Sequence, residues 1–135
     1  KAKIISAKVL KTGMNKSGKA VKDFCINQGL LLSNVHVIVD DIDLPLGKLR
    51  IRPKGGDGCH RGMESIIYQN RDNNFPRIRF GIAVGSKLRP SEQYVLKDFK
   101  KSDQNLADEM IIRAADAAEL IFEDGLNKAM NKYNA

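Results

Sequence analysis

Aromatic side chains are scarce in this chain, which has no tryptophan and only 6% aromatic residues. Stacking on bases is therefore a poor candidate for the main source of affinity for a nucleic acid. No apolar run approaches about 18 residues, so we expect no membrane span. The only two cysteines, Cys25 and Cys59, lie far apart without a CxxC spacing. A disulfide framework would need more cysteines, so we expect reduced thiols in a reducing compartment.

The chain also lacks an initial methionine and any basic n-region leading into an apolar segment. We therefore expect no signal peptide, and we interpret a chain that starts at Lys1 as a processed or truncated product. Its length suits one domain over residues 1–135, with the apolar and charged fractions of an ordinary globular protein.

Acidic residues are missing from the first 22 positions, which carry seven lysines, whereas seven of the sixteen acids gather after residue 102. The formal net charge is +7. This asymmetry indicates one face that receives a polyanion, mainly through phosphate contacts.

Hydrophobic periodicity predicts both strands and helices. Strands are predicted over residues 3–10, 35–39, 48–54 and 77–82, and helices over residues 18–29, 63–68, 91–99 and from 102 to a break at Gly125, with a last turn reaching Tyr133. Ser17 and Ser102 are the expected N-caps, and Gly29 is an expected stop. The long helix carries a core stripe at helical spacing, namely Leu106, Met110, Ala114, Ala117 and Ile121.

Basic side chains alternate along the strand predicted over residues 48–54, where Lys48, Arg50, Arg52 and Lys54 point one way. A solvated outer face explains such a pattern, and so does a face that follows phosphates. The strand predicted over residues 77–82 shows the same alternation of basic side chains, with Arg77 and Arg79. A second strand of this kind favours the phosphate-binding alternative.

Three carboxylates, Asp40, Asp41 and Asp43, follow the apolar strand predicted over residues 35–39. They could form a Mg²⁺ site, because hard cations bind carboxylate oxygens. A carboxylate fixed at a strand end is better suited to orienting an imidazole. Since ligands collect beyond the carboxyl ends of strands in α/β sheets, we expect Asp40 and His60 to be neighbours around one cleft.

A glycine loop over residues 55–62 opens the next helix but lacks the GKS/T ending of a nucleotide P-loop. Backbone amides at a helix start favour a general anion cradle instead. The adjacent Cys59 and His60 also allow a thiol hydrolase, and His36 is interpreted as a packing residue. Asn15, just ahead of a helix, is either a turn former or an amide that faces a substrate carbonyl.

Five blocks together resemble bacterial-type peptidyl-tRNA hydrolase. They are Met14-Asn15-x-Ser17-Gly18-x-Ala20-Val21, Asp40-x-x-Asp43-Leu44-Pro45-x-Gly47, Gly55-Gly56-x-Gly58-x-His60-x-Gly62, Pro76-Arg77-x-Arg79-x-Gly81-Ile82 and Asp124-Gly125-Leu126-x-Lys128-Ala129-Met130-Asn131. The blocks keep the family's order and approximate spacing.

The resemblance implies a single α/β domain with a mixed β-sheet flanked by helices, and no metal or organic cofactor. It implies hydrolysis of the ester between a peptide and the 3′ end of tRNA, with Asp40 orienting the histidine that activates water. It further implies that Met14, Asn15, His60 and Arg61 bind substrate and that Arg52 and Arg79 bind the terminal tRNA phosphate.

The chain departs from the family pattern in two regions. The family's first central strand, its Gly-Asn-Pro-Gly turn and the following catalytic histidine have no match here. In the glycine loop, Arg61 replaces an asparagine and Asp57 adds a negative charge.

Two functional hypotheses remain open at this stage. One is most of a peptidyl-tRNA hydrolase whose N-terminal part is missing from this chain, and which acts in the cytoplasm, or in the mitochondrial matrix or chloroplast stroma if organellar. The other is an inactive homologue that binds tRNA or rRNA as a subunit of a ribonucleoprotein. Neither involves a membrane partner.

Overall fold

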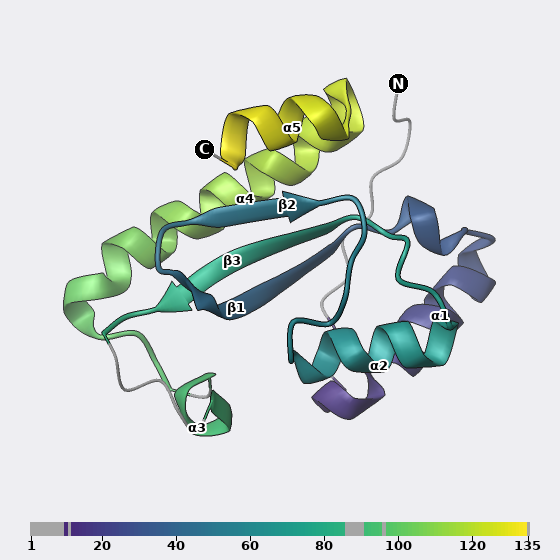
Figure 1. Cartoon of the computed structure of the whole chain (residues 1–135), viewed down its shortest axis with the longest axis horizontal. Helices are drawn as coiled ribbons and strands as arrows, with labels where there is room; N and C mark the ends of the chain where they lie inside the picture. The colour runs from purple at the N-terminus through teal and green to yellow at the C-terminus, as the bar shows by residue number, and fades with distance from the viewer. Residues whose placement is uncertain (1–9, 11, 86–90, 96, 135) are drawn as a thin grey trace. The chain divides into compact units, whose positions relative to one another are not determined.

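The computed structural model describes residues 10, 12–85, 91–95 and 97–134 (Figure 1). The strand predicted over residues 3–10 lies outside the described residues except for Leu10, and so does the connection at 86–90. The chain divides into two compact units. We call Lys1–Val37 with Arg52–Arg77 the helical unit, and Ile38–Ile51 with Ile78–Ala135 the sheet unit. None of the described helices is both long and apolar enough to cross a membrane.

The helical unit begins with the 3-10 turn Met14–Lys16, which runs directly into α1 (Ser17–Gln28). The prediction of Ser17 as N-cap is wrong: Ser17 is already helical, because its N–H completes the preceding turn by donating to Met14 O. Gly29 ends α1 in the left-handed region, with φ 64°, as its lack of a Cβ favours. A second 3-10 turn, Leu32–Asn34, and α2 (Arg61–Asn70) complete the unit's helices.

Helices α1 and α2 pack closely where Gly18 meets Ser65. The Gly18 N–H donates to Ser65 Oγ over 2.9 Å, and the Ser65 hydroxyl donates to Asn15 O over 3.0 Å. A Cβ at position 18 would lie only 2.0 Å from the Ser65 carbonyl oxygen. Glycine is therefore required there, and the contact fixes the backbone of the turn that carries Asn15.

The described residues form a three-stranded sheet in the order β1-β3-β2. The sheet belongs to the sheet unit, except for the strand-end residues Val37, Arg52 and Arg77, which belong to the helical unit. Its strands are β1 (Val37–Pro45), β2 (Leu49–Arg52) and β3 (Arg77–Ala83). Pairs at both ends, Val37 N–H to Pro76 O and Leu46 N–H to Ala83 O, make β1 parallel to β3. The Gly81 N–H donates to Lys48 O, and this pairing makes β2 antiparallel to β3. The predicted mixed sheet is confirmed.

Strand β1 differs from its prediction. It begins at Val37, so His36 precedes it, and it continues to Pro45. The three aspartates therefore lie within the strand rather than beyond its end, because pairing with β3 carries the extended backbone through them.

The helices of the sheet unit are α3 (Ser91–Val95), α4 (Gln104–Asp124) and α5 (Leu126–Tyr133), with a 3-10 turn at Lys101–Asp103 before α4. Helix α3 is shorter than predicted, and the cap assigned to Ser102 is wrong because that residue lies inside the 3-10 turn. Gly125 separates α4 from α5 as predicted.

Helix α4 lies along the sheet and α5 turns back beside β2 (Figure 1). Their shared core consists of Leu49, Ile51, Ile78, Met110, Ala114, Ala117, Ile121, Ala129 and Tyr133. Four of the five predicted stripe residues are thus confirmed. Leu106 is 42% exposed instead, and Ala107 takes the buried place at that end of the helix.

Candidate functional site

Met14 and His60, far apart in the sequence, meet over Gly62 in the helical unit. A Cβ at position 62 would lie 3.1 Å from Met14 Sδ and 2.9 Å from His60 Cε1. Only a glycine leaves both side chains in this position. The structure therefore brings together two of the residues for which the resemblance implies substrate binding.

His60 is the N-cap of α2, with extended backbone at φ −88° and ψ 122°. Its Nδ1 accepts a hydrogen bond from the Met63 N–H over 3.2 Å. A ring nitrogen that accepts a hydrogen bond carries no proton, so the ring's proton is on Nε2. The imidazole is fixed in orientation by the helix it caps.

Asn15 and Arg61 flank this pair along the chain, and both are exposed. The Asn15 backbone is held by the Ser65 hydroxyl, and a Cβ at Gly13 would lie 3.2 Å from Asn15 Oδ1. Arg61 is the first residue of α2. The substrate-binding roles of all four residues stay predictions.

The glycine loop uses its amides internally, which changes the anion-cradle interpretation. Asp57 Oδ1 accepts from the Cys59 N–H over 2.9 Å, and Asp57 O accepts from the His60 N–H over 3.0 Å. The Glu64 N–H donates to His60 O. A carboxylate of the chain itself thus occupies the place where an external anion was expected.

The thiol-hydrolase alternative requires the His60 ring to activate Cys59. The ring nitrogen Nδ1 instead accepts the Met63 amide, and Cys59 is exposed with its backbone in the left-handed region, at φ 60°. The other thiol, Cys25, is buried in α1, and this burial raises its pKa. Both cysteines are free thiols.

Asp40 lines a cavity of about 600 Å³ within the sheet unit. The remaining lining residues are Phe80, Ile82, Val84, Gly85, Tyr94, Val95, Lys97, Asp98, Phe99, Lys100 and Asp103. Tyr94 ties one wall to the sheet, because its hydroxyl accepts from the Val84 N–H over 3.0 Å and donates to Ile82 O. Apolar walls with a few charged groups are typical of a ligand cavity.

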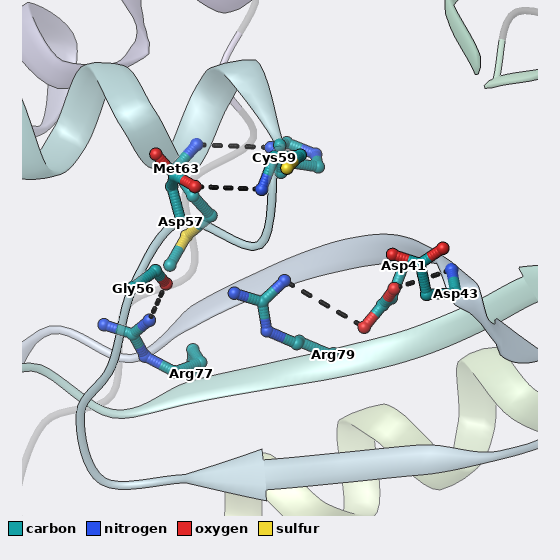
Figure 2. Close-up of polar contacts among 9 residues, drawn as sticks. Asp41, Asp43, Gly56, Asp57, Cys59, Met63, Arg77 and Arg79 are labelled. Carbon is teal, nitrogen blue, oxygen red and sulfur yellow. Dashed lines mark hydrogen bonds and ion pairs between the residues drawn. The ribbon is translucent and has the colours of Figure 1, made fainter. Parts of the chain in front are cut away.

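Asp41 follows Asp40 along β1, and its carboxylate is held within the sheet unit. Its Oδ2 lies 4.0 Å from Arg79 Nη1, and its Oδ1 accepts from the Asp43 N–H over 2.8 Å (Figure 2). These contacts use both oxygens that the predicted Mg²⁺ site would need from Asp41. Among the described residues there is no cluster of three His, Cys, Asp or Glu side chains able to hold a metal.

The basic residues predicted to line one face of β2 and of β3 have different environments in the two strands. In β2 the alternation is confirmed, with Leu49 and Ile51 buried and Arg50 and Arg52 exposed. In β3 it is wrong for Arg77, which is only 1% exposed, because carbonyl oxygens of two loops surround its guanidinium. Arg79 keeps a side chain that is 12% exposed.

The predicted clamp and the predicted Asp40–His60 pair each join residues of different units. Arg52 and His60 belong to the helical unit, and Arg79 and Asp40 to the sheet unit. Both pairings stay predictions. Sequence reasoning missed the structural part played by Arg77, Gly62 and Ser65. Arg77 and Gly62 could have been singled out from the sequence, because both stand inside the blocks that match the family.

A family model for peptidyl-tRNA hydrolase matches residues 2–135. Among curated relatives, peptidyl-tRNA hydrolase from Thermoanaerobacter sp. (strain X514) is 47% identical over 91% of this chain and 66% of its own length. The enzyme of the same name from Alkaliphilus metalliredigens is 42% identical over 98% of this chain and 70% of its own length.

The fold is also similar to solved structures. The crystal structure of peptidyl-tRNA hydrolase from Acinetobacter baumannii matches with a TM-score of 0.80 at 33% identity, over 92% of this chain and 63% of that one. The chain thus spans about two thirds of the length of the relatives it matches. Match length, identity and fold agree, and the chain belongs to the peptidyl-tRNA hydrolase family.

Proposed function

We propose that this chain binds the acceptor end of peptidyl-tRNA and takes part in hydrolysing the ester between the peptide and the tRNA. The observation that carries the proposal is the meeting of Met14 and His60 over Gly62, beside the turn that holds Asn15. These are the positions at which the family blocks place substrate contacts. The names of the relatives support the same reaction.

Each predicted residue has a definite part in this proposal. Met14, Asn15, His60 and Arg61 contact the peptide and the 3′ end of the tRNA. Asp40, from its cavity in the sheet unit, orients the group that activates water. Arg52 and Arg79 bind phosphate, and no metal or organic cofactor takes part.

The second hypothesis, an inactive RNA-binding subunit of a ribonucleoprotein, gains no support from the relatives, which are named as hydrolases. The relatives reported above are bacterial. This origin favours the cytoplasm over an organelle as the place of action.

The test is release of N-acetyl-amino acid from N-acetyl-aminoacyl-tRNA, a minimal peptidyl-tRNA. Turnover by the chain that falls about 10²- to 10⁴-fold in Asp40→Asn, the range expected when acid–base catalysis is impaired, would support a part in hydrolysis. Asp116→Asn is the matched control, because Asp116 is an exposed carboxylate on α4. Binding without turnover would favour the second hypothesis, and absence of both would contradict the proposal.

A further inference from the structure

Arg77 is a buried cation whose side chain has no route to a tRNA phosphate. The side chain is 1% exposed. Its Nε donates to Phe75 O over 3.1 Å, its Nη1 to Gly56 O over 2.9 Å and its Nη2 to Asn73 O over 3.0 Å. The guanidinium also lies 4.4 Å from the centre of the Phe75 ring. Burial of a charged group is unfavourable unless its donors find acceptors, and here each of the three guanidinium nitrogens donates to a carbonyl oxygen.

The carbonyl oxygens that receive these bonds come from two different loops. Gly56 belongs to the glycine loop, and Asn73 and Phe75 belong to the loop before β3. Asn73 O also accepts from the Gly55 N–H over 3.3 Å. Arg77 therefore joins the glycine loop to the start of β3 (Figure 2).

Because Arg77 holds Gly56, the hydrogen bonds of the next loop residues also restrain His60. Asp57 follows Gly56 and binds the N–H groups of Cys59 and His60 through its side chain and its carbonyl. His60 then caps α2 by accepting the Met63 N–H at Nδ1. Every contact in this series lies within the helical unit. The orientation and the tautomer of His60 thus depend on where Gly56 is held.

We propose that Arg77 is a positioning residue, which holds the glycine loop through Gly56 and so fixes the orientation of the His60 ring in the proposed substrate site. The link to substrate rests on the proposed function. The positioning of His60 does not, and it can be measured without RNA. Arg77 differs in this from Arg79 of the same strand, whose guanidinium lies beside a carboxylate and keeps some exposure.

The first experiment records ¹⁵N signals of the His60 ring and amide exchange of Cys59, His60 and Met63. Arg77→Lys keeps the charge but cannot reach three carbonyls at once. We expect the wild-type ring to show one tautomer and Arg77→Lys to show a mixture. We also expect exchange of the three amides to be about tenfold faster, the effect of one weakened hydrogen bond. Arg71→Lys, at an exposed arginine of the same unit, is the matched control and should leave these signals unchanged.

The second experiment measures the salt dependence of binding to an RNA hairpin that copies the tRNA acceptor stem. The slope of log affinity against log salt is negative, and loss of one phosphate contact makes it shallower by about 0.7–0.9. We expect Arg77→Lys to weaken binding equally at all salt concentrations with an unchanged slope, and Arg79→Gln to lower the slope.

The outcomes separate the two proposals. If Arg77→Lys gave a shallower slope of log affinity against log salt but unchanged His60 ring signals, Arg77 would be a phosphate ligand and the inference would be overturned. Unchanged ring signals together with unchanged hairpin binding would also overturn it. If the wild-type chain did not bind the hairpin, the proposed function would fail, and the ring and exchange data would still decide the positioning of His60. If Arg77→Lys did not fold, Asp57→Ala would interrupt the same series one step later. Unchanged His60 signals in that variant would overturn the inference.

Discussion

Arg79 and Asp41 face each other across β3 and β1, with 4.0 Å between guanidinium Nη1 and carboxylate Oδ2. Both side chains are largely buried, at 12% and 18% exposure. If Arg79 binds a tRNA phosphate, that phosphate meets a guanidinium already partly neutralised by Asp41. The strand that carries the predicted catalytic carboxylate therefore also restrains the predicted phosphate ligand.

Asp41→Asn should strengthen binding to the acceptor-stem hairpin by about two- to fivefold, as expected for loss of a charge pair worth up to about 1 kcal/mol. The asparagine keeps an oxygen for the Asp43 N–H, so the strand should keep its shape. The measurement is a titration at fixed low salt, with Asp116→Asn as the exposed control. Weaker binding would show that Asp41 holds Arg79 in its binding position instead of competing for it.

Gly62→Ala should separate function from stability. The new methyl group would meet the His60 ring and Met14 Sδ, so binding of the hairpin should weaken about tenfold, equivalent to about 1.4 kcal/mol. Helix propensity favours alanine by up to about 1 kcal/mol, and displacement of the capping His60 ring costs about 0.5–2 kcal/mol, so the free energy of unfolding should change by no more than about 1 kcal/mol. Urea unfolding and hairpin titration check the two halves. Unchanged binding would remove Met14 and His60 from the proposed site.

Asn134 closes the outer edge of β2 in the sheet unit. Its Oδ1 accepts from the Ile51 N–H over 2.7 Å and its Nδ2 donates to Ile51 O over 3.0 Å. Asn134→Asp cannot donate to that carbonyl, and we expect it to lower the free energy of unfolding by about 1–3 kcal/mol. Asn131→Asp, at an exposed position of α5, is the control. Equal urea midpoints for the two variants would contradict the assignment.

Stability should fall on the acid side of neutrality through His36. Burial lowers the pKa of His36 below its ordinary value of 6.5. Below pH 6.5 the unfolded chain therefore binds a proton that the folded chain resists, so the free energy of unfolding decreases as the pH falls toward the folded pKa. His36→Gln should make the free energy of unfolding less dependent on pH between pH 7 and the range in which carboxylates titrate. Urea unfolding at a series of pH values tests it, and an unchanged profile would contradict it.

The sequence predicted best those features that local chemistry decides. Gly29 ends α1 in a left-handed conformation, Gly125 separates α4 from α5, and Met110 to Ile121 form the core stripe. In each case spacing or a missing Cβ determines the outcome. The alternation of β2 was equally readable because one face is buried and the other is exposed.

The errors have a common physical cause, namely tertiary contacts that the sequence pattern does not display. Arg77 followed the spacing of a solvated stripe, yet its guanidinium is buried against carbonyl oxygens of two loops. Strand β1 continued through three aspartates because β3 pairs with it. Ser17 is not the N-cap because a 3-10 turn precedes it, and Met14 and His60 both lie close to Gly62 because α2 packs against that same turn.

The most direct test of the central claim, recognition of the acceptor end of tRNA, is the salt dependence of hairpin binding in Arg52→Gln and Arg79→Gln. Each variant should lower the slope of log affinity against log salt by about 0.7–0.9, because each removes one phosphate contact. Arg71→Gln should leave the slope at its wild-type value. Wild-type slopes in both Arg52→Gln and Arg79→Gln would contradict the account.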